Sequence, residues 1–140
     1  MASVIDPATI AAYRATEYQV GDPPAFGIRI GVHSVELADL HRTHRVAASA
    51  FVTACNPFGQ SLPDDQNAQH HRALCADVER RGLNAIEGVG EDPAGQWQGE
   101  RSVLILGATR ELTIELGHLY EQNAVVWSGA DALPELILLR

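Results

Sequence analysis

The clearest hydrophobic pattern runs from Val46 to Pro57, where an apolar, β-tolerant segment ends abruptly in a polar turn. A run of this kind bounded by turn residues indicates a buried strand. Pro57 cannot donate to a strand ladder and disfavours helical backbone at Asn56, so the strand should end near Cys55. Thr53 and Asn56 then lie at its carboxyl end, where open α/β sheets usually hold ligands.

Helical signals occur four times, and the first is short. The expected N-caps are Asp6 for the short helix, then Ser34, Asp64 or Asp65, and Thr109. Strand patterns fall at residues 26–30, 46–55, 100–106, 124–127 and 136–139, with weaker signals at 16–20 and 84–87. Turn or loop composition marks residues 21–24 and the Gly-rich, acidic stretch 88–99.

These patterns predict one α/β (α+β) domain spanning residues 1–140, with a central sheet of about five strands and three main helices. The strand, helix and strand between residues 26 and 55 suggest either a βαβ unit or an antiparallel layer with helices on one face. The hydrophobic content of 46% is ordinary for a globular chain of this length.

The helix that starts near Asp64 carries polar side chains on its apolar stripe. The stripe of Leu74 and Val78 extends backward at helical spacing to His71 and Asn67. Burying either polar side chain without a partner would cost about 1–3 kcal/mol. We therefore expect partners or a water-lined cavity there, and the loop at residues 56–63 is close enough to supply them.

Charge and composition limit the function classes. A net charge of −8 argues against general binding to a nucleic acid backbone. The absence of lysine excludes Schiff-base chemistry and a P-loop lysine. With no signal-peptide pattern and no apolar run near the roughly 20 residues of a membrane span, we expect a cytoplasmic location and no membrane association. No oligomeric state is predicted.

The histidines and cysteines give no established signature. His41 and His44 lie three apart on a predicted helix, but no third ligand is implied, so we predict no metal and no cofactor. Cys55 and Cys75 match neither a zinc nor a thioredoxin spacing. Nothing near Cys55 in the sequence would lower the pKa of its thiol, so packing is the favoured role.

Polar side chains gather at the ends of several predicted elements, and such a set of amides, hydroxyls and charged groups suits a polar ligand. For each residue taken alone, a structural role is an equal alternative. The candidate ligand-binding residues are Thr53, Asn56, Asn67, Arg72, Ser102, Gln122 and Asn123, and the candidate acid–base pair is Glu100 with His71. Asn56, Asn67, Glu100 and Gln122 in particular should converge, because each lies where a core-facing stripe becomes polar.

A set of motifs occurs in order along the chain: Phe26-Gly-Ile-Arg-Ile-Gly31, Phe51-Val-Thr-Ala-Cys-Asn-Pro57, Asn67 with Arg72 and Leu74, Gly88 with Gly90 and Asp92, Trp97, Glu100 with Ser102, and Gln122-Asn-Ala-Val-Val-Trp127. Together these motifs resemble DUF3293, a family of uncharacterised bacterial proteins, over residues 13–138. The resemblance implies a shared motif set and no particular activity. The sequence differs from the expected pattern at Cys55, where Trp is expected, and at Gly59-Gln60, where Ser is commoner.

Three functions follow as hypotheses. The first is a cytoplasmic protein whose polar pocket binds a small polar or nucleotide-like ligand. The second is an enzyme, a hydrolase or transferase, with Glu100 as acid or base and His71 or Asn67 assisting. The third is an interaction or regulatory module with a purely structural polar cluster, which would lack an open pocket. We expect Arg72 or another arginine to neutralise Glu100, with Arg72 favoured because it belongs to the same motif set, and this pairing would favour binding or structure. A raised pKa of Glu100 would instead favour catalysis.

Overall fold

A computed structural model describes residues 3–21, 25–95 and 98–140 of the chain. Residues 22–24 of the turn predicted at 21–24, and the motif residue Trp97, therefore lie outside the described residues. In order, the elements are α1 (Pro7–Ala15), β1 (Glu17–Val20), β2 (Phe26–Ile28), α2 (Val35–His44), β3 (Ser49–Thr53), a 3-10 turn (Pro57–Gly59), α3 (Asp64–Arg80), β4 (Asn84–Glu91), β5 (Glu100–Leu106), α4 (Arg110–Leu119), β6 (Ala124–Ser128) and β7 (Glu135–Leu138).

The mixed α/β class is confirmed, with more elements than predicted. The described residues form four α-helices and one seven-stranded sheet in the order β2-β1-β4-β5-β3-β6-β7. Each neighbouring pair is antiparallel. The βαβ alternative is wrong, because β2 and β3, the strands on either side of α2, are separated in the sheet by β1, β4 and β5.

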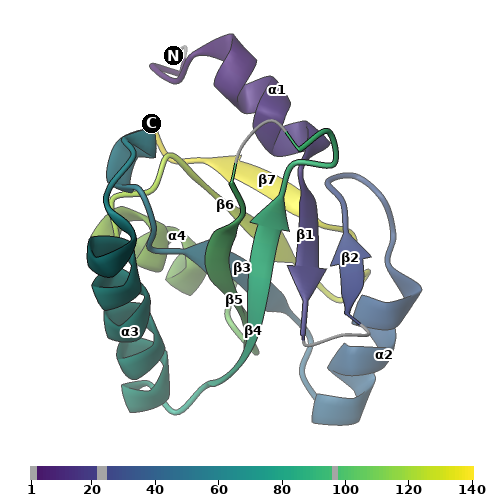
Figure 1. Cartoon of the computed structure of the whole chain (residues 1–140). Helices are drawn as coiled ribbons and strands as arrows, with labels where there is room; N and C mark the ends of the chain where they lie inside the picture. Colours follow the sequence, from purple (N-terminus) through teal and green to yellow (C-terminus); the bar gives the residue numbers. More distant parts are fainter. Residues whose placement is uncertain (1–2, 22–24, 96–97) are drawn as a thin grey trace.

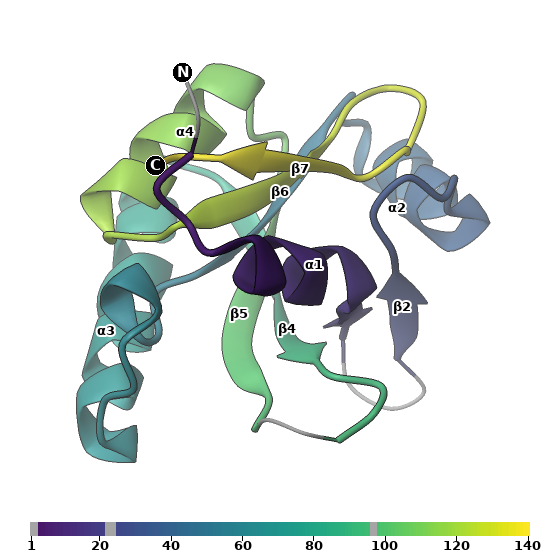
Figure 2. The same ribbon diagram turned by 90° about the horizontal axis from the view of Figure 1, so that it is seen from above.

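The helices cover both faces of the curled sheet, which also corrects the expectation of helices on one face. In Figures 1 and 2, α3 and α4 lie on one side of the sheet, α2 lies on the other, and α1 crosses over one end. Alternation along β3 serves both layers: Ala50 and Val52 belong to the core under α3 and α4, and Phe51 belongs to the core that includes Leu37 of α2.

Helix starts follow the predicted caps with one exception. The side chains of Asp6, Ser34 and Thr109 accept hydrogen bonds from backbone N–H groups in the first turns of α1, α2 and α4. The exception is α3, whose N-cap is Pro63. Asp64 and Asp65 lie instead in the first turn of α3, where the helix dipole favours carboxylates.

The predicted loop at residues 88–99 begins too early, because β4 continues to Glu91. Gly88 is a strand residue where another chain segment approaches closely. A Cβ atom there would lie 2.5 Å from the Gln19 carbonyl oxygen and 2.9 Å from the Phe51 ring. Glycine composition therefore reports close packing at this position and not a turn.

No helix within the described residues combines the length and apolar character needed to cross a membrane.

Candidate functional site

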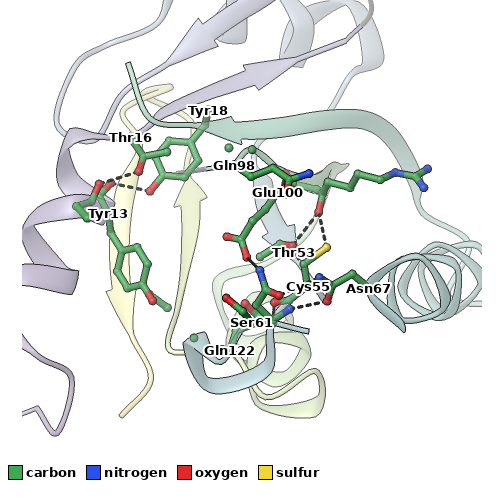
Figure 3. A pocket seen from close by; sticks show the side chains of 18 of the residues that line it. Tyr13, Thr16, Tyr18, Thr53, Cys55, Ser61, Asn67, Gln98, Glu100 and Gln122 are labelled. Carbon is green, nitrogen blue, oxygen red and sulfur yellow. Dashed lines mark hydrogen bonds between the residues drawn. The ribbon is translucent and has the colours of Figure 1, made fainter. Parts of the chain in front are cut away.

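A cavity of about 730 Å³ lies at the end of the sheet, beneath α1. Its walls come from α1, β1, β3, β5, the loop after β3, and the first turns of α3, and Figure 3 shows their side chains from close by. The exposed residues Ser61 and Gln98 lie in the lining, so the cavity opens to solvent. The lining side chains used below are those of Ala12, Tyr13, Thr16, Tyr18, Phe51, Thr53, Cys55, Asn56, Asn67, Glu100, Ser102 and Gln122.

Strand register explains why residues distant in the sequence share this cavity. Thr53 of β3 is paired with Ser102 of β5, and Glu100 lies two residues earlier on the same face of β5. Gly90 of β4 is the register partner of Glu100, so no side chain fills the space beside the carboxylate from that strand.

Asn56 and Asn67 form the centre of the polar wall. The Asn67 side-chain oxygen accepts the Asn56 backbone N–H at 2.9 Å, and Asn67 Nδ2 donates to Asn56 Oδ1 at 2.8 Å. Asn67 Nδ2 also donates to the Leu62 carbonyl at 3.3 Å, and Asn56 Oδ1 accepts the Leu62 N–H at 2.9 Å. Asn56 itself adopts a left-handed backbone with φ of 48°. The two amides thus fix the loop that follows β3.

Glu100 extends this network into the cavity. Asn56 Nδ2 donates to Glu100 Oε2 at 2.8 Å, while Glu100 Oε1 accepts no hydrogen bond from the described residues. Burial raises the pKa of the Glu100 carboxyl, and the hydrogen bond from Asn56 offsets only part of that rise. Glu100 is therefore a partly buried acid with one oxygen facing the cavity (Figure 3).

The predicted pairing of Glu100 with Arg72 is wrong. Arg72 is exposed, and among the described residues no arginine forms an ion pair with Glu100. The helix accounts for this. Arg72 follows Asn67 by five residues, a rotation of roughly 140° around α3, so its side chain points away from the wall that Asn67 joins.

Three other predicted residues line the cavity and hold its backbone. Thr53 Oγ1 donates to the Arg101 carbonyl at 2.8 Å and accepts the Cys55 N–H at 3.0 Å. Gln122 Nε2 donates to the Cys55 carbonyl at 3.1 Å. Ser102 Oγ donates to the carbonyl of Glu100 at 3.0 Å. The structure therefore brings Asn56, Asn67, Glu100 and Gln122 into one cluster.

Cys55 lies in the same wall, and its surroundings favour the thiol form. Burial raises the pKa of its thiol, which argues against a nucleophile.

The structure separates His71 from Glu100, which corrects the predicted acid–base pair. The stripe of α3 passes from the end of the sheet, where Asn67 lies, onto the face opposite the cavity. His71 is buried there, with Nε2 2.8 Å from Glu87 Oε1. Glu87 and Glu100 lie on opposite faces, because Gly88 and not Glu87 is paired with Ser102.

Asn123 is also absent from the cavity lining. It follows Gln122 directly, and the two side chains diverge. Asn123 Nδ2 donates to the Tyr13 hydroxyl at 3.1 Å, and Asn123 Oδ1 accepts from Arg140 at 3.0 Å. Its amide therefore helps to attach α1.

His41, one of the two histidines considered as metal ligands, is buried on α2, where Nε2 lies 2.8 Å from Ser49 Oγ. Burial lowers its pKa.

Sequence reasoning missed the aromatic wall of the cavity, which Tyr18 and Phe51 form. Tyr18 of β1 is buried, its hydroxyl donates to the Tyr13 carbonyl at 2.7 Å, and its ring meets Phe51 edge-on at a centroid distance of 5.2 Å. Burial raises the pKa of Tyr18, and the nearby Glu100 charge adds to the rise. The available signal was the alternation of Thr16, Tyr18 and Val20, which are all buried.

Fold and site together define a mixed α/β protein with a solvent-open polar pocket at one end of an antiparallel sheet. The family model described as "Protein of unknown function (DUF3293)" matches residues 52–125, just over half of the chain. The chain therefore belongs to the DUF3293 family. The matched segment includes the amide and carboxylate wall of the pocket and excludes α1 and Tyr18. Comparison with curated proteins gave no match, and comparison with solved structures gave none either.

Proposed function

We propose that the pocket under α1 binds a small polar ligand. One observation carries this proposal: a cavity of about 730 Å³ exposes a partly buried carboxylate that has no cationic partner among the described residues. Small-molecule sites commonly occupy about 300–1,000 Å³ and combine apolar walls with a few fixed polar groups. A purely structural cluster would not require such an opening.

The walls indicate the chemistry of the ligand. Glu100 Oε1 suits a hydrogen-bond donor, such as an amide, an amine or the N–H edge of a nucleobase. The Tyr18 and Phe51 rings on the adjoining wall suit a planar or apolar part of the same molecule. A nucleoside-like compound satisfies both demands.

Blocking the pocket from α1 tests this proposal. Ala12 lines the cavity, while its neighbour Ala11 is exposed and lies outside the lining. We expect nucleosides, nucleotides or other small amides, screened by thermal shift and then by calorimetry, to include a compound that binds the wild type. Ala12→Trp should abolish that binding and Ala11→Trp should preserve it. Equal binding by both variants, or no bound compound in the panel, would contradict the proposal.

Acid–base catalysis is the second candidate, favoured by the raised pKa of Glu100. A carboxyl group with a raised pKa can donate or accept a proton nearer to neutral pH than an ordinary one. With a compound that binds, wild-type protein should then form a product detectable by mass spectrometry. Glu100→Gln should retain binding and lose product formation, and unchanged turnover in this variant would exclude the role.

A further inference from the structure

A second group of chemically active side chains lies on the opposite face of the sheet, outside the pocket. His71 and Cys75 are one turn apart on α3, and Glu87 faces them from β4. The Cys75 sulfur is 3.5 Å from His71 Nε2 and 3.6 Å from Glu87 Oε2. His71 Nε2 is 2.8 Å from Glu87 Oε1. We call these residues the His71 cluster.

The arrangement does not fit a catalytic relay. In a relay of cysteine, histidine and acid, the thiol and the carboxylate contact different ring nitrogens, so that a proton passes across the imidazole. Here both contact Nε2. The other nitrogen, Nδ1, is buried without a hydrogen-bond partner among the described residues, and His71 is only 1% exposed. Within the part of the chain that the structure describes, the polar contacts of the ring are therefore all made by Nε2, which both the thiol and the carboxylate approach.

We propose that the His71 cluster binds a divalent transition-metal ion of the zinc type through His71 Nε2, Cys75 Sγ and a Glu87 oxygen. Nitrogen, thiolate and carboxylate are the donors that tetrahedral Zn²⁺ takes in proteins. Ligand bonds of about 2.0–2.3 Å place the sulfur about 3.5 Å from the other two donors, and place the nitrogen and oxygen about 3.3 Å apart. With Glu87 Oε2 as the oxygen donor, the sulfur distances of 3.5 Å and 3.6 Å already match, so only the 3.0 Å contact between His71 Nε2 and Glu87 Oε2 has to lengthen.

The surroundings allow that adjustment. The Glu87 side chain is 56% exposed, so its carboxylate can shift outward and a water molecule can complete the coordination. Arg101 competes for this carboxylate: its Nη2 lies 3.5 Å from Glu87 Oε1, and its side chain is 57% exposed. Such an exposed pair is weak, so a metal ion can displace the guanidinium. On binding, the Cys75 thiol loses its proton to solvent.

This proposal does not depend on ligand binding in the pocket, because the two groups lie on opposite faces of the sheet. Co²⁺ provides the most direct test, because thiolate ligation produces a charge-transfer band in the near ultraviolet and tetrahedral geometry produces intense visible bands. We expect both with purified, chelator-treated full-length protein at one Co²⁺ per chain. Cys75→Ser should abolish the charge-transfer band. The matched control, Cys55→Ser, changes the other cysteine and should leave the band intact.

A second measurement uses Zn²⁺ and tests the Glu87 carboxylate instead of the cysteine. A metal that binds only the folded state raises the melting temperature. Zn²⁺ should therefore stabilise the wild type and the control Glu91→Gln, an exposed substitution on the same strand. Glu87→Gln should weaken Zn²⁺ binding by more than roughly tenfold, since even outer-shell substitutions commonly cost a site 10- to 100-fold.

Three results would overturn the proposal. These are absence of the charge-transfer band in the wild type, its persistence in Cys75→Ser, and equal Zn²⁺ affinity in Glu87→Gln and Glu91→Gln. Melting curves of each metal-free variant establish that it is folded before binding is compared.

Discussion

Asn67 and His71 lie one turn apart on the same stripe of α3, yet their polar atoms are used very differently. The Asn67 amide accepts one hydrogen bond and donates two, all to the loop after β3. His71 contacts the thiol and the carboxylate through Nε2, and its Nδ1 is buried with no partner in the part of the chain that the structure describes. A buried polar group with all its hydrogen bonds made stabilises the fold, whereas a buried group without a partner costs stability. His71 Nε2 contacts a thiol and an exposed carboxylate, so this atom can still bind a ligand. Glu100, with one oxygen bonded and one facing the cavity, is intermediate.

The largest effect should come from Asn67→Leu. Leucine removes the partners of the Asn56 N–H and the Leu62 carbonyl, and an unsatisfied buried group costs about 1–3 kcal/mol. Urea unfolding should show a loss of about that size. Gln66→Leu, an exposed neighbour, should change the free energy of unfolding by less than about 0.5 kcal/mol. Wild-type stability in Asn67→Leu would show that the network is dispensable.

Asp77, also on α3, extends the comparison to a charged group. Burial raises its pKa, but hydrogen bonds from Arg81 and Tyr120 outweigh burial, so the net pKa lies below 3.8. Its contribution is thus present above the unfolded-state pKa and is lost as the pH falls through the lowered value. We expect the stability difference between wild type and Asp77→Asn, measured by urea unfolding, to shrink on acidification below about pH 4. Glu91→Gln, an exposed control, should follow the wild type. Parallel curves for wild type and Asp77→Asn would contradict this.

Glu100 should show the opposite pH dependence. Its pKa in the folded protein lies above 4.5, so its contribution is fully present below that value and is lost as the pH rises through the folded pKa. Glu100→Gln, which keeps an acceptor for Asn56, should therefore melt at a higher temperature than wild type near about pH 7, and the gap should close on acidification. Carboxyl NMR should give a Glu100 pKa above 4.5. A lower value would remove the support for acid–base chemistry.

The smallest effect is expected for His71→Leu in metal-free protein. Leucine removes the buried Nδ1, which has no partner within residues 3–21, 25–95 and 98–140, while the exposed Glu87 keeps its contact with Arg101. The free energy of unfolding should change by less than about 1 kcal/mol, well below the effect of Asn67→Leu on the same helix. A loss equal to that of Asn67→Leu would show that the number of satisfied hydrogen bonds does not distinguish the two residues.

Local signals in the sequence were enough to predict the positions of the helices, the central strand and most of the residues in the pocket wall. Apolar periodicity placed Asn67 and His71 on one stripe, and strand alternation placed Glu100 with Ser102. What periodicity could not supply was the order of the strands, which determines on which face a side chain emerges. Because Gly88 and not Glu87 is paired with Ser102, His71 and Glu100 belong to different sites. Likewise, the glycines of β4 resembled a loop in composition. Their actual role depends on close contacts with β1 and β3, which the local sequence does not show.

The attachment of α1 has a consequence for amide hydrogen exchange. None of the nine residues of α1 is buried, although the helix covers the pocket, and the hydrogen bonds to Tyr13 from Tyr18 and Asn123 are among the few that attach it. Segments with little buried surface open at a free energy far below that of global unfolding. The α1 amides should therefore exchange much faster than those of β3 and β5. A ligand filling the cavity from below would slow them selectively, so exchange in a single helix would report occupancy of the pocket before the ligand is identified.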